Sequence, residues 1–224
     1  MAKKKKPAIV EPPIGRLCLV TPAGADPSVF AGALEAAFQG GDVATLFIVD
    51  EGASPAALQK LAEVAVPIAQ AHGAAAIVPN DTRLFGRVHA DGLHVDTGIA
   101  DLKAALDTLR PDGMVGAGGL TTRHDAMLAG EADCDYLFFG RFDGDTGDAI
   151  FDKAFDLAAW WSAVFEIPAV VMGGRAIASV AEAVDARIEF VALRSAVWEH
   201  PEGPAAAVAE ANRLIAAHQA EALP

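Results

Sequence analysis

Two short apolar stretches near the end of the chain are each followed at once by residues that suit an anion. Gly173 and Gly174 follow the first stretch, and Arg194 and Ser195 follow the second. Glycine lets the backbone come close to a ligand, and free N–H groups at the start of a helix favour negative charge. The pattern indicates a phosphate site, or else only a tight turn at the glycines and a helix cap at Ser195.

These residues need a scaffold, and strand-like and helix-like patterns alternate along the chain from residue 16 onward. Eight apolar stretches are expected as strands: residues 17–20, 43–49, 74–78, 92–95, 113–116, 136–139, 169–172 and 190–193. Strands this apolar belong to a parallel sheet that is covered on both faces by helices. Eight strand–helix units predict an α/β fold of one domain, a (β/α)₈ or TIM barrel over residues 16–224. No G-x-G-x-x-G motif follows the first strand to favour an open dinucleotide-binding sheet.

The carboxyl ends of the strands meet at one rim of such a barrel, and function collects at that rim. Polar residues or glycines follow nearly every expected strand. In chain order they include Thr21, Asp50, Glu51, Asn80, Asp81, His94, Asp96, Gly116, Gly140, Arg141, Gly173, Gly174, Arg194 and Ser195. Two of them have a structural interpretation as well, because Asp81 can cap the next helix and His94 lies inside an apolar strand. The sequence therefore predicts a ligand site at this rim.

Composition narrows the class of partner and the compartment. Hydrophobic residues make up 53% of the 224 residues, yet no apolar run is long enough to span a membrane. A net charge of −13 argues against nucleic acid. The lysine run at residues 3–6 lies among prolines and predicts a disordered basic leader over residues 1–15, without the apolar region of a signal peptide. Cys18 and Cys134 lack metal-ligand spacing, so we expect reduced thiols in a cytoplasmic protein.

Several short motifs follow one another in a defined order. They are IVPNDTRLFGRVHADGLHVD and MVGAGG, then ADCDYLFFGRF, and finally Gly173-Gly174 and Ser195. Their order and spacing over residues 16–197 resemble the thiamine phosphate synthase family and its thiazole tautomerase-like relatives. The matching residues are Asn80, Asp81, Asp91, Gly92, Leu93, His94, Gly116, Asp135, Tyr136, Gly140, Gly173, Gly174 and Ser195.

The resemblance implies coupling of an aminopyrimidine diphosphate to a thiazole phosphate, with release of pyrophosphate. It implies Mg²⁺ as cofactor, with Asp81 as a ligand and Asp96 in the place of a second metal-binding carboxylate. Asn80 would bind the diphosphate, and Asn80, Asp81 and His94 form the candidate catalytic set. Gly173, Gly174, Arg194 and Ser195 would hold the thiazole phosphate. The expected partner is thus a small phosphorylated ligand, and the oligomeric state stays open, a homodimer included.

The chain departs from the family pattern in one direction, the loss of positive charge. The family ends its second strand with an Arg and a Lys two residues apart, where we place Ile48 and Asp50. It carries a Lys after strand six, where this chain has an acidic loop at residues 143–148 that we expect to be flexible. We therefore expect slow coupling or none. Two alternatives remain: a non-catalytic phosphate-ligand binder or regulatory protein, and a sugar-phosphate isomerase or epimerase with Asp50 or Asp96 as base.

Overall fold

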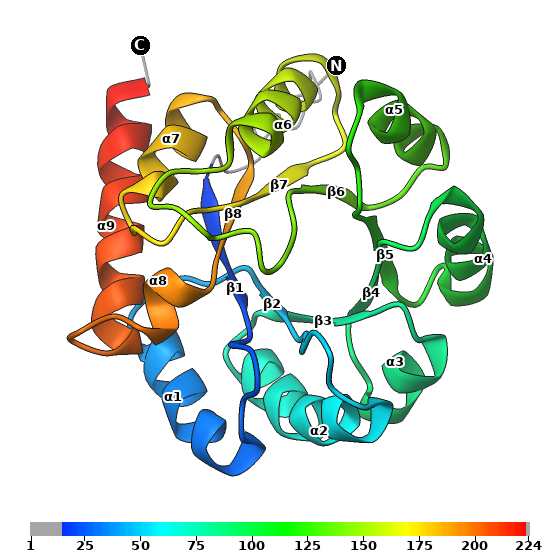
Figure 1. Ribbon diagram of the computed structural model, residues 1–224, viewed down its shortest axis with the longest axis horizontal. Helices are drawn as coiled ribbons and strands as arrows, with labels where there is room; N and C mark the ends of the chain where they lie inside the picture. The colour runs from blue at the N-terminus through cyan, green and yellow to red at the C-terminus, as the bar shows by residue number, and fades with distance from the viewer. Residues whose placement is uncertain (1–14, 223–224) are drawn as a thin grey trace, which may run out of the picture.

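Eight parallel strands close into a barrel in the order in which they occur along the chain (Figure 1). The computed structural model describes residues 15–222. The strands are β1 (Arg16–Val20), β2 (Thr45–Phe47), β3 (Ala75–Pro79), β4 (Gly92–Val95), β5 (Met114–Ala117), β6 (Tyr136–Phe139), β7 (Ala169–Met172) and β8 (Phe190–Leu193). Because β1 pairs with both β2 and β8, the sheet has no open edge, and the predicted barrel is confirmed.

The helices form a ring outside the strands (Figure 1). They are α1 (Pro27–Gln39), α2 (Pro55–Ala71), α3 (Thr82–Val88), α4 (Ile99–Leu109), α5 (Arg123–Glu131), α6 (Asp152–Val164), α7 (Ser179–Asp185), α8 (Ser195–Trp198) and α9 (Pro204–Ala222). Two helix starts are written in adjacent residues, because Asp26 caps α1 and Ser54 caps α2, each with proline at the first helical position. The sequence indicated a helix start at Ser195, and the helix there, α8, is a single turn.

Side chains fill the interior of the barrel, which is a packed core rather than a pore. Phe47, Tyr136, Phe138 and Phe142 belong to one buried cluster inside the strands. A larger cluster lies between the strands and the helices. Phe142 follows β6, is 9% exposed, and packs its ring 4.7 Å from that of Phe138. The aromatic interior thus reaches up to the rim at which a ligand would bind.

Strand β2 is shorter than the predicted stretch 43–49. The parallel ladder still continues beyond it, because Ile48 N donates to Ile77 O at 2.8 Å. Val49 then leaves the ladder and exchanges two hydrogen bonds with the hydroxyl of Thr21. A side chain therefore replaces the backbone partner at the carboxyl end of this strand.

Two expectations concern parts of the chain at and beyond the edge of the barrel. The predicted basic leader falls on residues outside the described range, except for Gly15. That residue is buried, and its N–H donates to Ile188 O at 2.9 Å. Within the described range, no helix is both long and apolar enough to cross a membrane.

Candidate functional site

The loops after β3 and β4 are joined by two hydrogen bonds. The Asn80 side-chain amide donates to Asp96 Oδ1 at 2.8 Å, and Asp96 N donates to Asn80 Oδ1 at 3.1 Å. Both residues are exposed at the rim. Asp50, the other carboxylate considered as a base, accepts a hydrogen bond from Gly24 N at 3.0 Å. The structure thus brings Asn80 and Asp96 together, as expected for a shared site.

Asp81 is the N-cap of α3. Its Oδ1 accepts from Arg83 N at 2.8 Å and from Leu84 N at 3.2 Å, which satisfies two free donors of the first turn. Among residues 15–222, no three His, Cys, Asp or Glu side chains gather to hold a metal ion. Mg²⁺ usually takes one or two carboxylates and completes its shell with water and phosphate oxygens. The exposed oxygens of Asp81 and Asp96 fit that mode of binding.

His94 faces the barrel interior and is 2% exposed. Its Nδ1 lies 3.1 Å from the hydroxyl of Tyr136, and its ring packs 4.8 Å from that of Phe142. Burial lowers the pKa of His94 to about 4, so the imidazole is neutral at pH 7. Of its two interpretations, this geometry is that of a core histidine, packed against the ring of Phe142.

The burial of His94 makes the stability of the fold depend on pH. The pKa of the folded state, about 4, lies below the ordinary value of 6.5, so the unfolded chain takes up the proton first as the pH falls. The stabilisation of the folded state by the neutral, buried His94 is therefore complete above about pH 6.5 and is lost as the pH falls toward 4. We expect the free energy of unfolding to drop by about 2 kcal/mol from this group between pH 7 and pH 5.

Urea unfolding of the wild type and of His94→Asn at both pH values, in EDTA-containing buffer, checks this expectation. The variant should lose this part of the pH dependence, whereas His124→Asn, at an exposed position on α5, should keep it. An NMR titration in which the His94 ring protonates near pH 6.5 would contradict the assignment.

The predicted phosphate loops lie next to each other, because β7 and β8 are paired neighbours. Gly173 N donates to Ala192 O at 2.8 Å, which fixes the start of the loop after β7 against β8. Gly174 N donates to the buried hydroxyl of Ser179 at 3.0 Å. Ser195 begins α8 directly after β8, so its N–H lies at the same rim. The four residues proposed from the sequence are therefore brought together.

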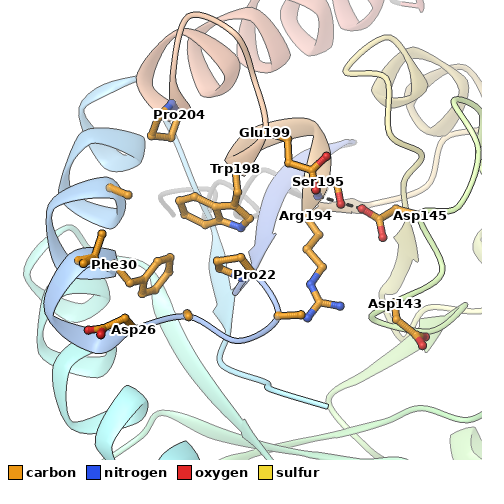
Figure 2. A pocket seen from close by; sticks show the side chains of 14 residues that line it. Pro22, Asp26, Phe30, Asp143, Asp145, Arg194, Ser195, Trp198, Glu199 and Pro204 are labelled. Atoms are coloured by element: carbon orange, nitrogen blue, oxygen red, sulfur yellow. Dashed lines mark hydrogen bonds between the residues drawn. The ribbon is translucent and has the colours of Figure 1, made fainter. Parts of the chain in front are cut away.

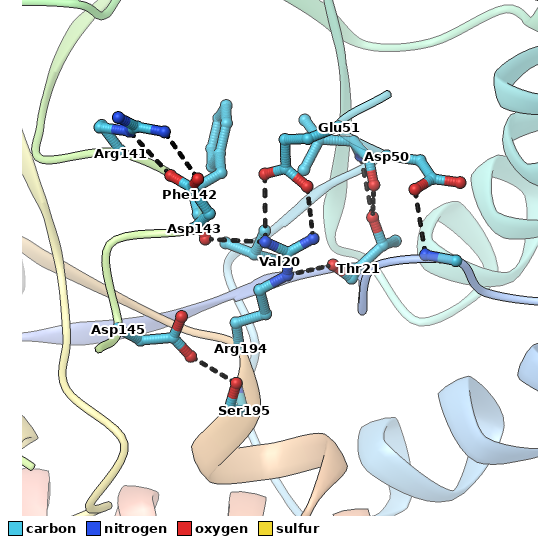
Figure 3. Close-up of polar contacts among 12 residues, drawn as sticks. Val20, Thr21, Asp50, Glu51, Arg141, Phe142, Asp143, Asp145, Arg194 and Ser195 are labelled. Atoms are coloured by element: carbon cyan, nitrogen blue, oxygen red, sulfur yellow. Dashed lines mark hydrogen bonds and ion pairs between the residues drawn. The ribbon is translucent and has the colours of Figure 1, made fainter. Parts of the chain in front are cut away.

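The acidic loop after β6 lies on these two loops. Ser195 N donates to Asp145 Oδ2 at 2.9 Å, and Asp145 is only 7% exposed although we expected a flexible, solvated loop (Figure 3). Arg175 N donates to Gly147 O at 2.8 Å. A side chain at Gly174 would meet the backbone of Asp148, so glycine is required for this approach. The backbone N–H groups of Ser195 and Arg175, which could bind a phosphate, therefore already donate to acceptors within the protein.

Arg194 also bonds to the protein. The side chain is 7% exposed, and its guanidinium donates to both carboxylate oxygens of Glu51, at 2.6 and 3.1 Å (Figure 3). It further donates to Thr21 O at 2.9 Å and to Phe142 O at 3.2 Å. Arg194 thereby ties the loops after β1, β2 and β6 to β8, and its charge is neutralised by Glu51.

The two neighbouring arginines at this rim are paired in the same way. Arg141 donates to both carboxylate oxygens of Asp143, at 2.6 and 2.8 Å. Arg175 forms an ion pair with Glu199. The arginines of the loops after β6 and β7 thus have carboxylate partners, as does Arg194.

The residues that face the interior at the end of β2 differ from those we expected. Ile48 is fully buried between the strands and the helices, so it is not the counterpart of a cation that faces the rim. Val49 belongs to the interior cluster, and Glu51, in the turn that follows, bonds to the buried Arg194 at the rim. The pair with the two-residue spacing is therefore Val49 and Glu51, not Ile48 and Asp50. The conclusion that no cation stands there is unchanged.

A side pocket of about 530 Å³ opens beside these loops, between α1 and α8 (Figure 2). Phe30 and Trp198 form part of its wall, with ring centroids 5.0 Å apart. The Trp198 indole donates to Val20 O at 2.6 Å, which fixes the ring in place. Asp145 and Ser195 are also among the residues that line the pocket. A ligand seated at Ser195 therefore has room for an organic body on this side.

Fold and site together define a (β/α)₈ barrel whose candidate ligand groups gather at the carboxyl ends of its strands. A family model described as thiamine monophosphate synthase (TMP-TENI) matches residues 17–197, nearly the whole barrel. The chain belongs to this family, and the resemblance seen in the motifs is confirmed.

Individual relatives agree with this assignment. The chain is 36% identical to a thiamine-phosphate synthase of Rhodospirillum centenum, over 89% of this chain and 97% of that protein. It is 34% identical to one of Hyphomonas neptunium, over 91% and 95% of the two chains. The solved structure of a thiamine phosphate pyrophosphorylase from Pyrococcus furiosus superposes with a TM-score of 0.73. The superposition covers 91% of this chain and 96% of the Pyrococcus furiosus chain, at 18% sequence identity, which supports the fold.

Sequence reasoning missed two residues that shape the site. Glu51 was recognised only as a rim residue, and its partner Arg194 lies 143 positions away. Asp145 was grouped with a solvated acidic loop, although it is buried against Ser195, fifty positions away. The excess of carboxylates over cations at the strand ends is the only signal in the sequence that pointed to such pairs.

Proposed function

We propose that the protein binds a small phosphorylated ligand of thiamine biosynthesis at the loops after β7 and β8, and that it couples the two thiamine precursors only slowly. Family membership and the relatives named thiamine-phosphate synthase support the class of ligand. One observation carries the second part of the proposal. In the loops after β6, β7 and β8, the arginines Arg141, Arg175 and Arg194 are each bonded to a carboxylate of the protein.

The chemistry explains why this matters. Departure of pyrophosphate builds negative charge, and catalysis of such a step depends on positive groups already in place. Bound Mg²⁺, held by Asp81 and Asp96, would neutralise part of that charge. Two hydrogen bonds to Asp96 fix the side-chain amide of Asn80 at the rim, where that amide would position a ligand. Glu51 and Asp143 engage Arg194 and Arg141, so these two cations are already neutralised by the protein rather than free to face a leaving group.

A non-catalytic ligand binder is the second candidate, and one observation favours it. The N–H groups of Arg175, Ala176 and Ser195 already have acceptors in the loop after β6. Such a site is stable without a ligand, as suits a protein that responds to ligand binding rather than turning it over.

Binding is tested by NMR titration of the full chain with thiazole phosphate, with the unphosphorylated thiazole alcohol as control. We expect the backbone amides of Gly174 and Ser195 to shift and saturate with the phosphate and to respond weakly to the alcohol. Saturation of resonances elsewhere, with these amides unmoved, would contradict the proposed site.

A further inference from the structure

We propose that Asp145 is an internal competitor of the ligand's phosphate, so that the loop after β6 has to withdraw before a phosphate can bind. This inference rests on the phosphate site proposed above, and it assigns to Asp145 the role of setting the affinity of that site. The loop consists of residues 140–151, between β6 and α6.

The competition follows from what the Asp145 carboxylate bonds to. A carboxylate and a phosphate are both anions that accept hydrogen bonds from backbone N–H groups, and such charged acceptors form the stronger bonds. Asp145 Oδ2 accepts from Ser195 N at 2.9 Å, and the residue is 93% buried, since it is 7% exposed. Two anions cannot share one N–H donor in a partly dry site without strong repulsion.

The backbone of the same loop covers the second half of the site. Gly147 O accepts from Arg175 N at 2.8 Å, and Asp148 O accepts from Ala176 N at 3.3 Å. Gly174 packs against the backbone of Asp148. Phosphate cannot reach the donors after β7 while these carbonyls occupy them. One loop therefore closes the parts of the site contributed by β7 and by β8 at the same time.

The position of Asp145 distinguishes it from the other carboxylates of the loop. Asp143 is bonded to Arg141, and the Asp148 side chain is exposed to solvent. Asp145 is the buried member, aimed at Ser195 rather than at a cationic side chain. Replacing Asp145 or Asp148 by Asn removes one negative charge from the same loop, so the pair separates a direct contact from a general effect of charge.

The test is an NMR titration with inorganic phosphate of the wild type, Asp145→Asn, Asp145→Ala and Asp148→Asn. Removing the charged acceptor at position 145 should tighten binding at the Ser195 and Arg175 amides by about tenfold. Asp148→Asn should change it by no more than about twofold, the scale of a solvent-screened charge. In the wild type, the amide of Gly147 should shift with the same dissociation constant as that of Ser195, because the loop leaves as phosphate arrives.

The two proposals fail in different ways. Equal tightening in Asp145→Asn and Asp148→Asn, or none in either, would overturn the role of Asp145 even if phosphate binds at Ser195. Phosphate binding at Ser195 in the wild type with Gly147 unmoved would overturn the withdrawal of the loop. If no variant, with its folded spectrum intact, shows a phosphate response at Ser195 or Arg175, the phosphate site itself is absent and both proposals fall.

Discussion

Supplied with aminopyrimidine diphosphate, thiazole phosphate and Mg²⁺, the purified protein is expected to form thiamine phosphate at least about 100-fold more slowly than a family member with the Arg and Lys at the end of its second strand. Removal of one preorganised donor from a site of developing charge typically costs about 10²–10³ in rate. In this chain Val49 and Glu51 occupy the face on which two such cations would stand. Effects of residues that act together need not add, so we predict a lower bound rather than a product.

The matched control places the same change in the active relative. Val and Glu substituted for its Arg and Lys should slow that enzyme to a similar extent, while its binding of thiazole phosphate persists. Ile48→Arg in this chain is not a rescue, because it would bury a cation beneath the helices. A turnover of about one per second by the wild type, within the usual range for enzymes, would contradict the prediction.

Replacing Arg194 is expected to cause the largest loss of stability among the rim residues. Arg194→Met keeps much of the apolar stem but leaves the carbonyls of Thr21 and Phe142 without their donor. Unpaired buried acceptors cost about 1–3 kcal/mol each. Glu51 is 40% exposed and can be hydrated, so its share is small. We expect the free energy of unfolding to fall by about 2–4 kcal/mol, measured by urea denaturation at pH 7.

An exposed ion pair of the same rim provides the control. Arg141→Met breaks the pair with Asp143, but the Arg141 side chain is 79% exposed, and pairs of this kind contribute about 0–1 kcal/mol. Equal losses in the two variants would show that Arg194 does not tie the loops together. Glu51→Gln, which keeps a hydrogen-bond acceptor for Arg194, should lie between them.

The barrel could be predicted from the sequence because its signals are local. Each strand is a short apolar stretch, and helix starts such as Asp26-Pro27 are written in adjacent residues. The end of β2 and the single turn α8 were harder to predict. The hydroxyl of Thr21, directly after β1, replaces the ladder partner of Val49, and α8 is too short to show helical periodicity.

The sequence predicted which residues lie at the candidate site, but not the hydrogen bonds and ion pairs that they form there. Adjacent strands place Gly174 beside Ser195, and the motif order places Asn80 and Asp81 at the same rim. The pairing of Asp145 with Ser195 joins residues from different strand–helix units, and no periodic pattern links such positions. Likewise, Arg194 was recognised as a cation suited to phosphate, and only the fold reveals that Glu51 neutralises it.

The central claim is that carboxylates of this chain occupy the positions at the rim where the anionic groups of a ligand would bind. A crystal structure of the protein grown with inorganic phosphate tests it most directly. We predict phosphate against the backbone of Gly174 and Ser195, with the Asp145 side chain withdrawn from Ser195 and Arg194 still bonded to Glu51. Phosphate bound at the rim with Asp145 still on Ser195, or held by an Arg194 that has left Glu51, would contradict the account.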